Sequence, residues 1–150
     1  MTAADLEPLH RYTSEEYHRL IEAGGFDEDA RVELIDGLLV EMSPKSREHE
    51  RAIERLVQWL TDIDWNRFRL RVAAPLTLAD GTEPEPDVAV VAADCEQPYH
   101  PASAELVVEV SASSQRRDLV IKPPKYAAAG IPVYLVVDLD NRRVIEHADP

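Results

Sequence analysis

The sequence predicts an α/β (α+β) fold in which helices flank a mixed central sheet, with an N-terminal helix and a β-hairpin. Strand-like and helix-like patterns follow one another in the order helix, hairpin, helix, two or three strands, short helix and two strands. The chain has 150 residues, which is the length of one domain, 1–150. Its 45% hydrophobic and 30% charged residues are typical of a globular chain with a core of its own.

The N-terminal third predicts a helix and then a hairpin. Thr13 to Glu16 has the S/T-x-x-E spacing of a capping box, and Gly24-Gly25 ends the apolar stripe that follows it. Residues 31–35 and 38–42 are apolar runs on either side of Asp36-Gly37. An Asp-Gly pair between two such runs is a strong hairpin signal.

The middle of the chain predicts one helix and several strands. From about Ser46 to Asp62 apolar residues recur at helical spacing. Residues 68–73 form a strand-like run, which 75–78 would continue after Pro75. Further strands are expected at 87–93 and at 105–111.

The C-terminal third predicts a short helix and two paired strands. Ser113-Ser114 could cap a helix, but Pro123-Pro124 interrupts it, so we expect a short turn before Pro123. A helix then runs to about Ala129, with Gly130 as its C-terminal cap. Residues 133–139 and 142–147 read as strands joined at a turn.

Composition excludes several classes of protein. The single cysteine, Cys95, allows neither an internal disulfide nor a Cys/His zinc finger. No apolar run approaches the roughly 18 residues of a membrane helix, and the acidic N-terminus is no secretory signal. We therefore expect a cytoplasmic protein that does not contact a membrane.

The net charge of −13 argues against a general nucleic-acid coat protein. Residues 76–110 alone hold eight acidic and no basic side chains. A local basic groove is still compatible with this charge, since Arg47, Arg51 and Arg55 recur at i, i+4 and i+8 on one helix face. Interleaved glutamates make a salt-bridged helix face the alternative interpretation.

Glu109 is the first candidate functional residue. It lies in the run Leu106 to Val110, which is apolar enough to be a central strand. A carboxylate there must be paired, protonated or bound to a metal, because burying an unpaired charge is costly. Alternation places Val107, Glu109 and Ser111 on one face of the strand. A partly hydrated face or an arginine partner is the alternative.

Asp87 and Lys122 are the next candidates. Asp87 opens a strand, and carboxylates at neighbouring strand ends can hold a hard divalent cation through oxygen. Lys122 follows Glu109 by 13 residues, and a lysine beside a metal-bound water can orient that water. The alternatives are an aspartate bound to its own backbone and a solvated lysine.

The sequence resembles the Uma-two family of putative restriction endonucleases, in the PD-(D/E)XK nuclease superfamily. The likeness covers nearly the whole chain and rests on the order and spacing of several short motifs. They are Thr13-x-Glu15-Glu16-Tyr17, Glu33 to Pro44 followed by His49, Pro86-Asp87, Leu106 to Ser114, and Asp118-x-x-x-Lys122-x-x-x-Tyr126 to Tyr134.

The resemblance implies a restriction-endonuclease-like core with a four-stranded mixed sheet, and metal-dependent phosphodiester hydrolysis. By this likeness Asp87 and Glu109 are the ligands of Mg²⁺ or Mn²⁺, and Lys122 is the catalytic lysine. The lysine that the superfamily usually carries two residues after the acid would fall at Ser111, where it is absent.

The likeness also suggests auxiliary and DNA-binding residues. Glu33 and His49 match an acid and a histidine near the family's site, and the auxiliary set is Glu33, His49, Lys125 and Tyr126. Taken alone, His49 would be a helix histidine and Glu33 a strand-surface acid. The expected contacts to DNA phosphates are Arg47, Arg51, Arg55, Arg116 and Arg117.

Two functions from different classes remain open on the sequence. The first is a metal-dependent DNA endonuclease, expected to act as a homodimer. The alternative is a catalytically inactive relative that works as a dimeric protein–protein interaction module. A third possibility, an enzyme for small phosphate esters, is disfavoured because the sequence has no phosphate-binding glycine loop: neither GxGxxG nor a Walker motif occurs.

Overall fold

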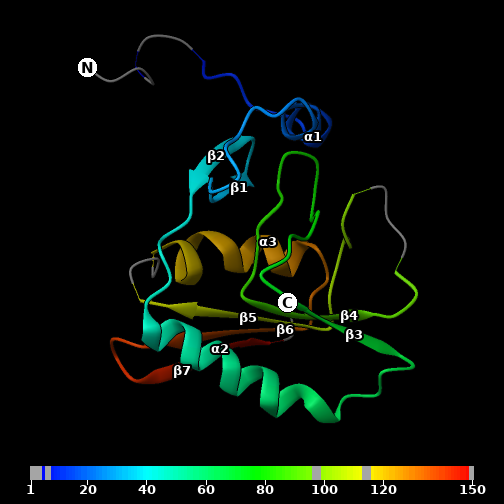
Figure 1. Cartoon of the computed structure of the whole chain (residues 1–150), viewed down its shortest axis with the longest axis vertical. Helices are drawn as coiled ribbons and strands as arrows, with labels where there is room; N and C mark the ends of the chain where they lie inside the picture. Colours follow the sequence, from blue (N-terminus) through cyan, green and yellow to red (C-terminus); the bar gives the residue numbers. More distant parts are fainter. Residues whose placement is uncertain (1–4, 6–7, 96–98, 113–115, 149–150) are drawn as a thin grey trace.

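The structure, a computed structural model, describes residues 5, 8–95, 99–112 and 116–148, and it has three layers (Figure 1). A five-stranded sheet lies between α2 on one face and α3 on the other, and α1 packs with a hairpin beyond α3. The elements are α1 Ser14–Glu22, β1 Val32–Ile35, β2 Leu38–Glu41, α2 Arg47–Trp59 with a 3-10 turn Leu60–Asp62, β3 Phe68–Val72, β4 Val88–Ala92, β5 Leu106–Ser111, a π-helical segment Arg117–Ile121, α3 Lys122–Ala128, β6 Val133–Asp138 and β7 Arg143–Ala148.

The main sheet has the order β3-β4-β5-β6-β7. Only β5 and β6 are parallel, and the other neighbouring strands pair antiparallel. β1 and β2 form a separate two-stranded sheet. The predicted fold class is therefore confirmed, with five strands in the main sheet where the resemblance implied four.

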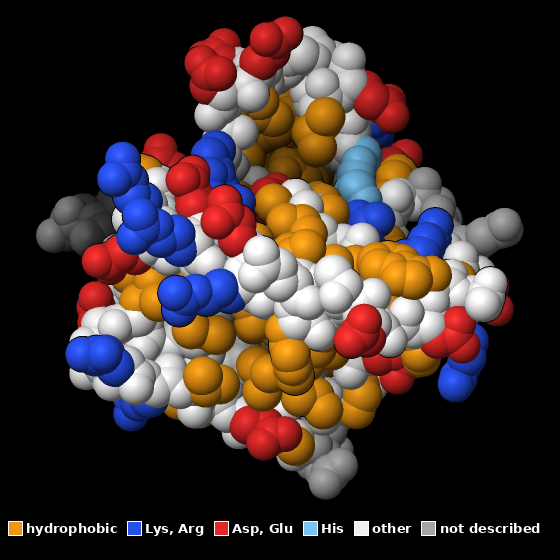
Figure 2. Space-filling view, turned by 60° about the horizontal axis from the view of Figure 1, so that its bottom comes forward, with side chains coloured by type: hydrophobic (Ala, Val, Ile, Leu, Met, Phe, Trp, Pro, Cys, Tyr) orange, Lys and Arg blue, Asp and Glu red, His pale blue; other side chains and the backbone are white. Residues whose placement is uncertain are grey.

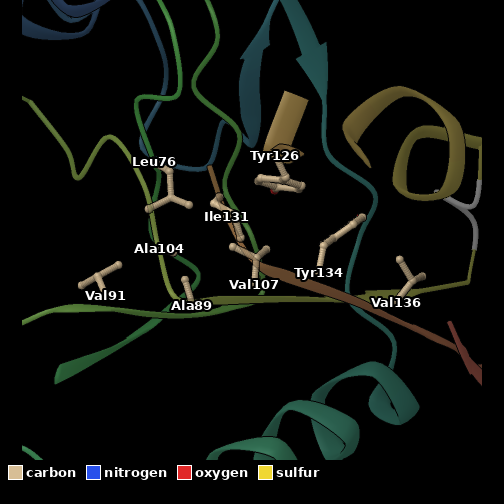
Figure 3. Packing of buried hydrophobic residues seen from close by; sticks show 9 residues of the cluster. All are labelled: Leu76, Ala89, Val91, Ala104, Val107, Tyr126, Ile131, Tyr134 and Val136. Carbon is tan, nitrogen blue, oxygen red and sulfur yellow. The ribbon is translucent and has the colours of Figure 1, made fainter. Parts of the chain in front are cut away.

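The alternation predicted for β5 separates two hydrophobic cores. Val107 faces α3, whereas Val108 and Val110 face α2. The core on the α3 face is shown in Figure 3 and consists of Leu76, Ala89, Val91, Ala104, Val107, Tyr126, Ile131, Tyr134 and Val136. Because β4 and β5 are buried on both faces, their positions are fixed by packing from two sides.

The N-terminal helix and hairpin form as predicted and are tied to the loop before β4. Thr13 caps α1 and makes both halves of the capping box with Glu16. The amide of Gly37 donates to the Gly81 carbonyl at 2.7 Å, and Leu34 forms a bridge with Glu83. These bonds hold β1, and with it Glu33, against the segment that leads to Asp87.

Residues 75–78 are not the strand continuation that the sequence predicts. Ala73 has a φ of +46°, which turns the chain away after β3. Pro75 has no amide hydrogen with which to continue a ladder. Leu76 and Leu78 instead donate to the Pro84 and Thr82 carbonyls, which folds this stretch back on itself.

The helix around Pro123 also differs from the prediction. A π-helical segment, not a short turn, precedes the prolines and runs directly into α3. The Lys122 amide donates to the Arg117 carbonyl, five residues back, and the two prolines occupy the first turn of α3, where a missing amide hydrogen costs little. Ser113 and Ser114, the predicted cap, lie outside the described residues.

We expect Gly37→Ala to destabilise the fold more than Gly24→Ala does. Both glycines have positive φ, +76° and +73°, so both variants carry the strain of about 1–2 kcal/mol that an L-residue feels there. A Cβ on Gly37 would also lie 2.5 Å from the Arg11 Cβ, whereas one on Gly24 meets nothing within 4 Å. Urea unfolding measures the difference, and equal losses would show that the contact of the hairpin turn with Arg11 is not tight.

Candidate metal centre

Asp87 and Glu109 are brought side by side by the pairing of β4 with β5. The register sets Val88 opposite Val108; Asp87 directly precedes Val88, and Glu109 directly follows Val108, so extending the same register by one step would set these two opposite each other. Directly opposed residues on one face of a sheet have Cβ atoms about 4.5–5.5 Å apart. Both are buried, at 7% and 4% exposure, and Asp87 Oδ2 accepts a hydrogen bond from the Val110 amide at 2.7 Å.

The ammonium group of Lys122 is buried among three carboxylates. Its Nζ donates to Glu109 Oε1 at 2.7 Å. It also lies 3.1 Å from Glu33 Oε2 and 3.7 Å from Asp118 Oδ1. Burial alone would lower the pKa of Lys122, but the carboxylates of Glu109, Glu33 and Asp118 outweigh it and raise that pKa above its ordinary value. Lys122 therefore remains protonated at neutral pH.

For the pKa of Glu109, burial outweighs the neighbouring charge. Burial raises the pKa of its carboxyl well above the usual range, and Lys122 counteracts this rise. Tyr126 OH donates to Glu109 Oε1 at 3.0 Å from the interior of α3. The same oxygen thus accepts from both Lys122 and Tyr126, which fixes the side chain and leaves the other oxygen, Oε2, outside this pair of bonds.

Glu33 is the carboxylate that the hairpin contributes to the surroundings of Lys122. Its side chain is fully buried, and Oε1 accepts from Arg117 Nη1 at 3.1 Å. The other oxygen, Oε2, accepts from the Glu85 amide at 3.1 Å. Arg117 continues to the Glu41 carbonyl at 2.9 Å, so it links the π-helical segment to both hairpin strands.

His49 approaches from the first turn of α2. Its Nε2 lies 3.3 Å from Asp87 Oδ1. In the described part of the chain its Nδ1 is buried and has no hydrogen-bond partner. Ser46 caps α2 through the His49 amide, and this cap sets where the ring enters the site.

These side chains surround a cavity of about 130 Å³, which is large enough for several waters or a hydrated ion. Arg31, Lys45, Ser46 and Glu85 are at its border. Burial raises the pKa of Glu85 as well. The acidic residues that line the cavity are Glu33, Glu85, Asp87, Glu109 and Asp118.

The donor set fits a hard divalent cation. Carboxylate oxygens are the ligands that Mg²⁺ and Mn²⁺ prefer, and this cavity has more carboxylates than cationic groups. Asp87 and Glu109 are the pair that the sheet register aligns. A bound cation would offset the burial that raises the pKa of Glu109.

Three other predicted residues lie elsewhere. Lys125 points to the hairpin turn, where its Nζ is 2.6 Å from Asp36 Oδ1, and it does not line the cavity. Arg116 is exposed directly before the π-helical segment. Arg47 is exposed on α2 and is not among the residues that line the acidic cavity.

Arg51 and Arg55 line a second, open groove between α2 and the β6–β7 turn. Arg142 and Arg143 come from the opposite side of this groove, and Trp59 lies at its end with 64% of its surface exposed. Figure 2, turned so that the α2 side comes forward, shows Lys and Arg side chains gathered beside exposed hydrophobic ones. Among the described residues, no ion pair links these helix arginines to the interleaved glutamates.

Sequence reasoning gave no role at the site to Glu85, Arg31 and Lys45, nor to Asp118, which it named only as part of a motif. Two of them carried a usable signal. Glu85 precedes Asp87 by two residues in an extended segment, and Asp118 precedes Lys122 by one helical turn. Arg31 and Lys45 border the cavity only because the hairpin folds over it, and no local pattern indicates this.

A mixed sheet between helices, with acidic residues on neighbouring strand segments and a buried lysine at the start of a helix, has the architecture of restriction-endonuclease-like proteins. The family model of Uma2, described as putative restriction endonuclease, matches residues 14–150. The chain therefore belongs to this family. No helix in the described residues is long and apolar enough to cross a membrane.

A solved structure shares the fold. It is the crystal structure of a putative nuclease belonging to DUF820 from Anabaena variabilis, with a TM-score of 0.73 and 14% identity. The match covers 94% of this chain and 80% of that one. A search of curated proteins finds no match.

Removing the buried lysine should cost far more stability than removing the exposed one. Lys122→Met leaves carboxylates buried without their cation, and we expect a loss of about 3–5 kcal/mol. Lys125→Met breaks a pair whose Asp36 side chain is 58% exposed, so a loss below about 1 kcal/mol is expected. Urea unfolding in EDTA measures both, and similar losses would contradict the assigned burial of Lys122.

Proposed function

We propose that the protein is a metal-dependent endonuclease that hydrolyses DNA phosphodiester bonds. The observation that carries the proposal is the convergence of Asp87, Glu109 and Lys122 on one acidic cavity. Membership of a family described as putative restriction endonuclease supports a nuclease.

Asp87 and Glu109 would hold Mg²⁺ or Mn²⁺, with Glu33 and Glu85 as further acids at the same cavity. When bound, the ion supplies Lewis-acid polarisation of a phosphate oxygen and acidifies a water. Hydrogen bonds within the protein hold the two ligand side chains in place. The Val110 amide holds one Asp87 oxygen, and Tyr126 and Lys122 hold one Glu109 oxygen.

Lys122 would orient the attacking water. As a protonated amine it has hydrogen-bond donors and no acceptor, so it acts by donation and by charge, and not as a base. It is held beside Glu109 at 2.7 Å, and this places the positive charge next to the proposed ligand pair. A fixed positive charge there would stabilise the negative charge that develops on the phosphoryl oxygens.

His49, Tyr126 and Glu33 would act as positioning residues. His49 lies against Asp87, Tyr126 against Glu109 and Glu33 against Lys122, so each contacts one member of the proposed set. Lys125 would contribute only indirectly, since its pairing with Asp36 links α3 to the hairpin turn.

DNA would be bound through local basic surfaces on an acidic protein. Arg117, Arg31 and Lys45 lie at the cavity, and Arg51 and Arg55 line the groove beyond α2. Arg47 and Arg116, both exposed, would add phosphate contacts outside these two surfaces. Such contacts position DNA without reading its sequence. We also propose that the protein acts in the cytoplasm as a homodimer.

Nicking of supercoiled plasmid at low salt tests the proposed reaction. We expect Mg²⁺ or Mn²⁺ to support conversion to nicked or linear DNA, and EDTA to abolish it. Asp87→Asn, Glu109→Ala and Lys122→Met should each lower the rate by about 10²-fold or more, which is the scale of losing one preorganised charged group. Lys125→Met is the matched control: its contribution is indirect, so it should cleave at close to the wild-type rate.

Folding controls separate catalysis from stability in this assay. Circular dichroism and urea unfolding identify any variant that is not folded at the assay temperature. Cleavage that survives in folded Asp87→Asn and Glu109→Ala would contradict the site. If the wild type neither cleaves nor shows a Mg²⁺-induced thermal shift, the dimeric interaction module becomes the better interpretation.

The salt dependence of DNA binding tests the groove beyond α2. If Arg51 and Arg55 each neutralise one phosphate, the Arg51→Gln/Arg55→Gln variant should reduce the slope of log K against log salt by about 2 on duplex DNA. Fluorescence anisotropy in Ca²⁺ or EDTA measures binding without cleavage. Arg19→Gln, on the exposed face of α1, is the control and should leave the slope unchanged.

A further inference from the structure

We infer that His18, Glu83 and His100 form a second metal site, which takes a borderline transition metal such as Zn²⁺ and joins α1 to the loop before β5. This inference does not rest on the proposed nuclease function. None of its three residues lines the acidic cavity at Asp87 and Glu109.

The three side chains meet from distant parts of the chain. His18 lies on α1, Glu83 on the segment that bridges to Leu34, and His100 just before β5. Each offers one ligand atom, and these atoms all lie within 4.8 Å of one another. Among the described residues, His18, Glu83 and His100 are the three His, Cys, Asp or Glu residues whose ligand atoms all lie this close together.

The His18–Glu83 separation is slightly shorter than the edge of a tetrahedral zinc site, and the His100 ligand atom lies within 4.8 Å of both. Zinc bonds to imidazole nitrogen and carboxylate oxygen at about 2.0–2.2 Å, which puts neighbouring ligand atoms roughly 3.3 Å apart. His18 Nε2 is 2.7 Å from Glu83 Oε2 and 3.0 Å from Oε1. A small opening of this contact would admit the ion, and a water would supply the fourth ligand.

The donor types distinguish this set from the acidic cavity. Two imidazoles and one carboxylate suit Zn²⁺, whereas Mg²⁺ and Ca²⁺ prefer oxygen alone. Glu83 is nearly fully buried, and among the described residues its recorded ion-pair partner is His18. A single histidine would satisfy that carboxylate as an ion pair, so the arrival of a second imidazole at the same place favours a metal.

The surroundings hold the ligands in place. Thr77 Oγ1 donates to Glu83 Oε1 at 3.1 Å, as the outer-shell partner of a ligating carboxylate commonly does. The His18 ring stacks on Tyr99, with centroids 3.9 Å apart and planes 4° from parallel. The Tyr99–His100 pair therefore contacts α1 through both of its rings, since the His18 and His100 centroids are 5.4 Å apart.

Thermal unfolding with added ZnCl₂ tests the site on chelator-treated full-length protein. At a free Zn²⁺ concentration of about 100 times Kd, we expect Tm to rise by about 5–10 °C, with one ion bound per site by calorimetric titration. His100→Gln is the informative variant. No hydrogen bond or ion pair of the His100 side chain is recorded in the described structure, so its metal-free Tm should stay near the wild-type value while the zinc response is lost.

Further variants separate this site from other zinc ligands. His49→Gln/Asp87→Asn removes the His–Asp pair at the acidic cavity, and Cys95→Ser removes the lone thiol; both should keep the zinc-induced rise. The inference is overturned if His100→Gln responds to Zn²⁺ as the wild type does, or if the response is lost only in the His49→Gln/Asp87→Asn variant. If the His49→Gln/Asp87→Asn variant loses nuclease activity but keeps the zinc response, the two sites are independent.

Discussion

The ion pair between Lys122 and Glu109 is the interaction on which the rest of the candidate site depends. Lys122 belongs to the first turn of α3, Glu109 to the central strand β5, and Glu33 to the hairpin. A buried ammonium is tolerable only where carboxylates surround it, and buried carboxylates likewise need a cation. The helix, the sheet and the hairpin are thus held in one arrangement by the mutual requirement of these charges.

The π-helical segment explains how Lys122 reaches this position. A regular helix starting near residue 116 would be broken by two consecutive prolines, because each lacks an amide hydrogen. The wider π turn places the prolines at the start of α3, directly after Lys122. Asp118 and Tyr126 lie one turn before and one turn after Lys122. Asp118 then contacts Lys122, and Tyr126 contacts Glu109. Local π-helical turns are frequent at functional sites.

Sequence reasoning reached those parts of the structure that depend on local chemistry. The capping box at Thr13, the Asp-Gly hairpin and the alternation of β5 are determined by neighbouring residues, and all three are confirmed. The continuation at 75–78 was wrong because the chain turns away at Ala73, whose positive φ is a conformation that an alanine in the sequence does not indicate. The pairing of Lys125 with Asp36 was out of reach for a similar reason, since 89 residues separate them.

The same reasoning applies to the site. Glu109 could be singled out because an apolar strand makes a buried carboxylate conspicuous, whereas Asp87 gained weight from its place at the start of a neighbouring strand and from the resemblance. Their proposed roles came from the resemblance, because spacing alone cannot distinguish a catalytic lysine from a solvated one. The histidine set was missed, as a search for Cys/His zinc patterns within short windows cannot detect ligands from three distant segments.

The two clusters share a short stretch of chain, and this affects how metal dependence must be interpreted. Glu83 and Glu85 are two residues apart, yet the first faces two imidazoles and the second lines the cavity that holds Asp87 and Glu109. Hard cations and borderline transition metals would therefore prefer different sites on the same segment. An ion bound at Glu83 would stiffen the connection into β4 and so act on the position of Asp87, four residues on. A zinc effect on cleavage would then be a structural effect transmitted along this segment, separate from the chemistry at Asp87 and Glu109.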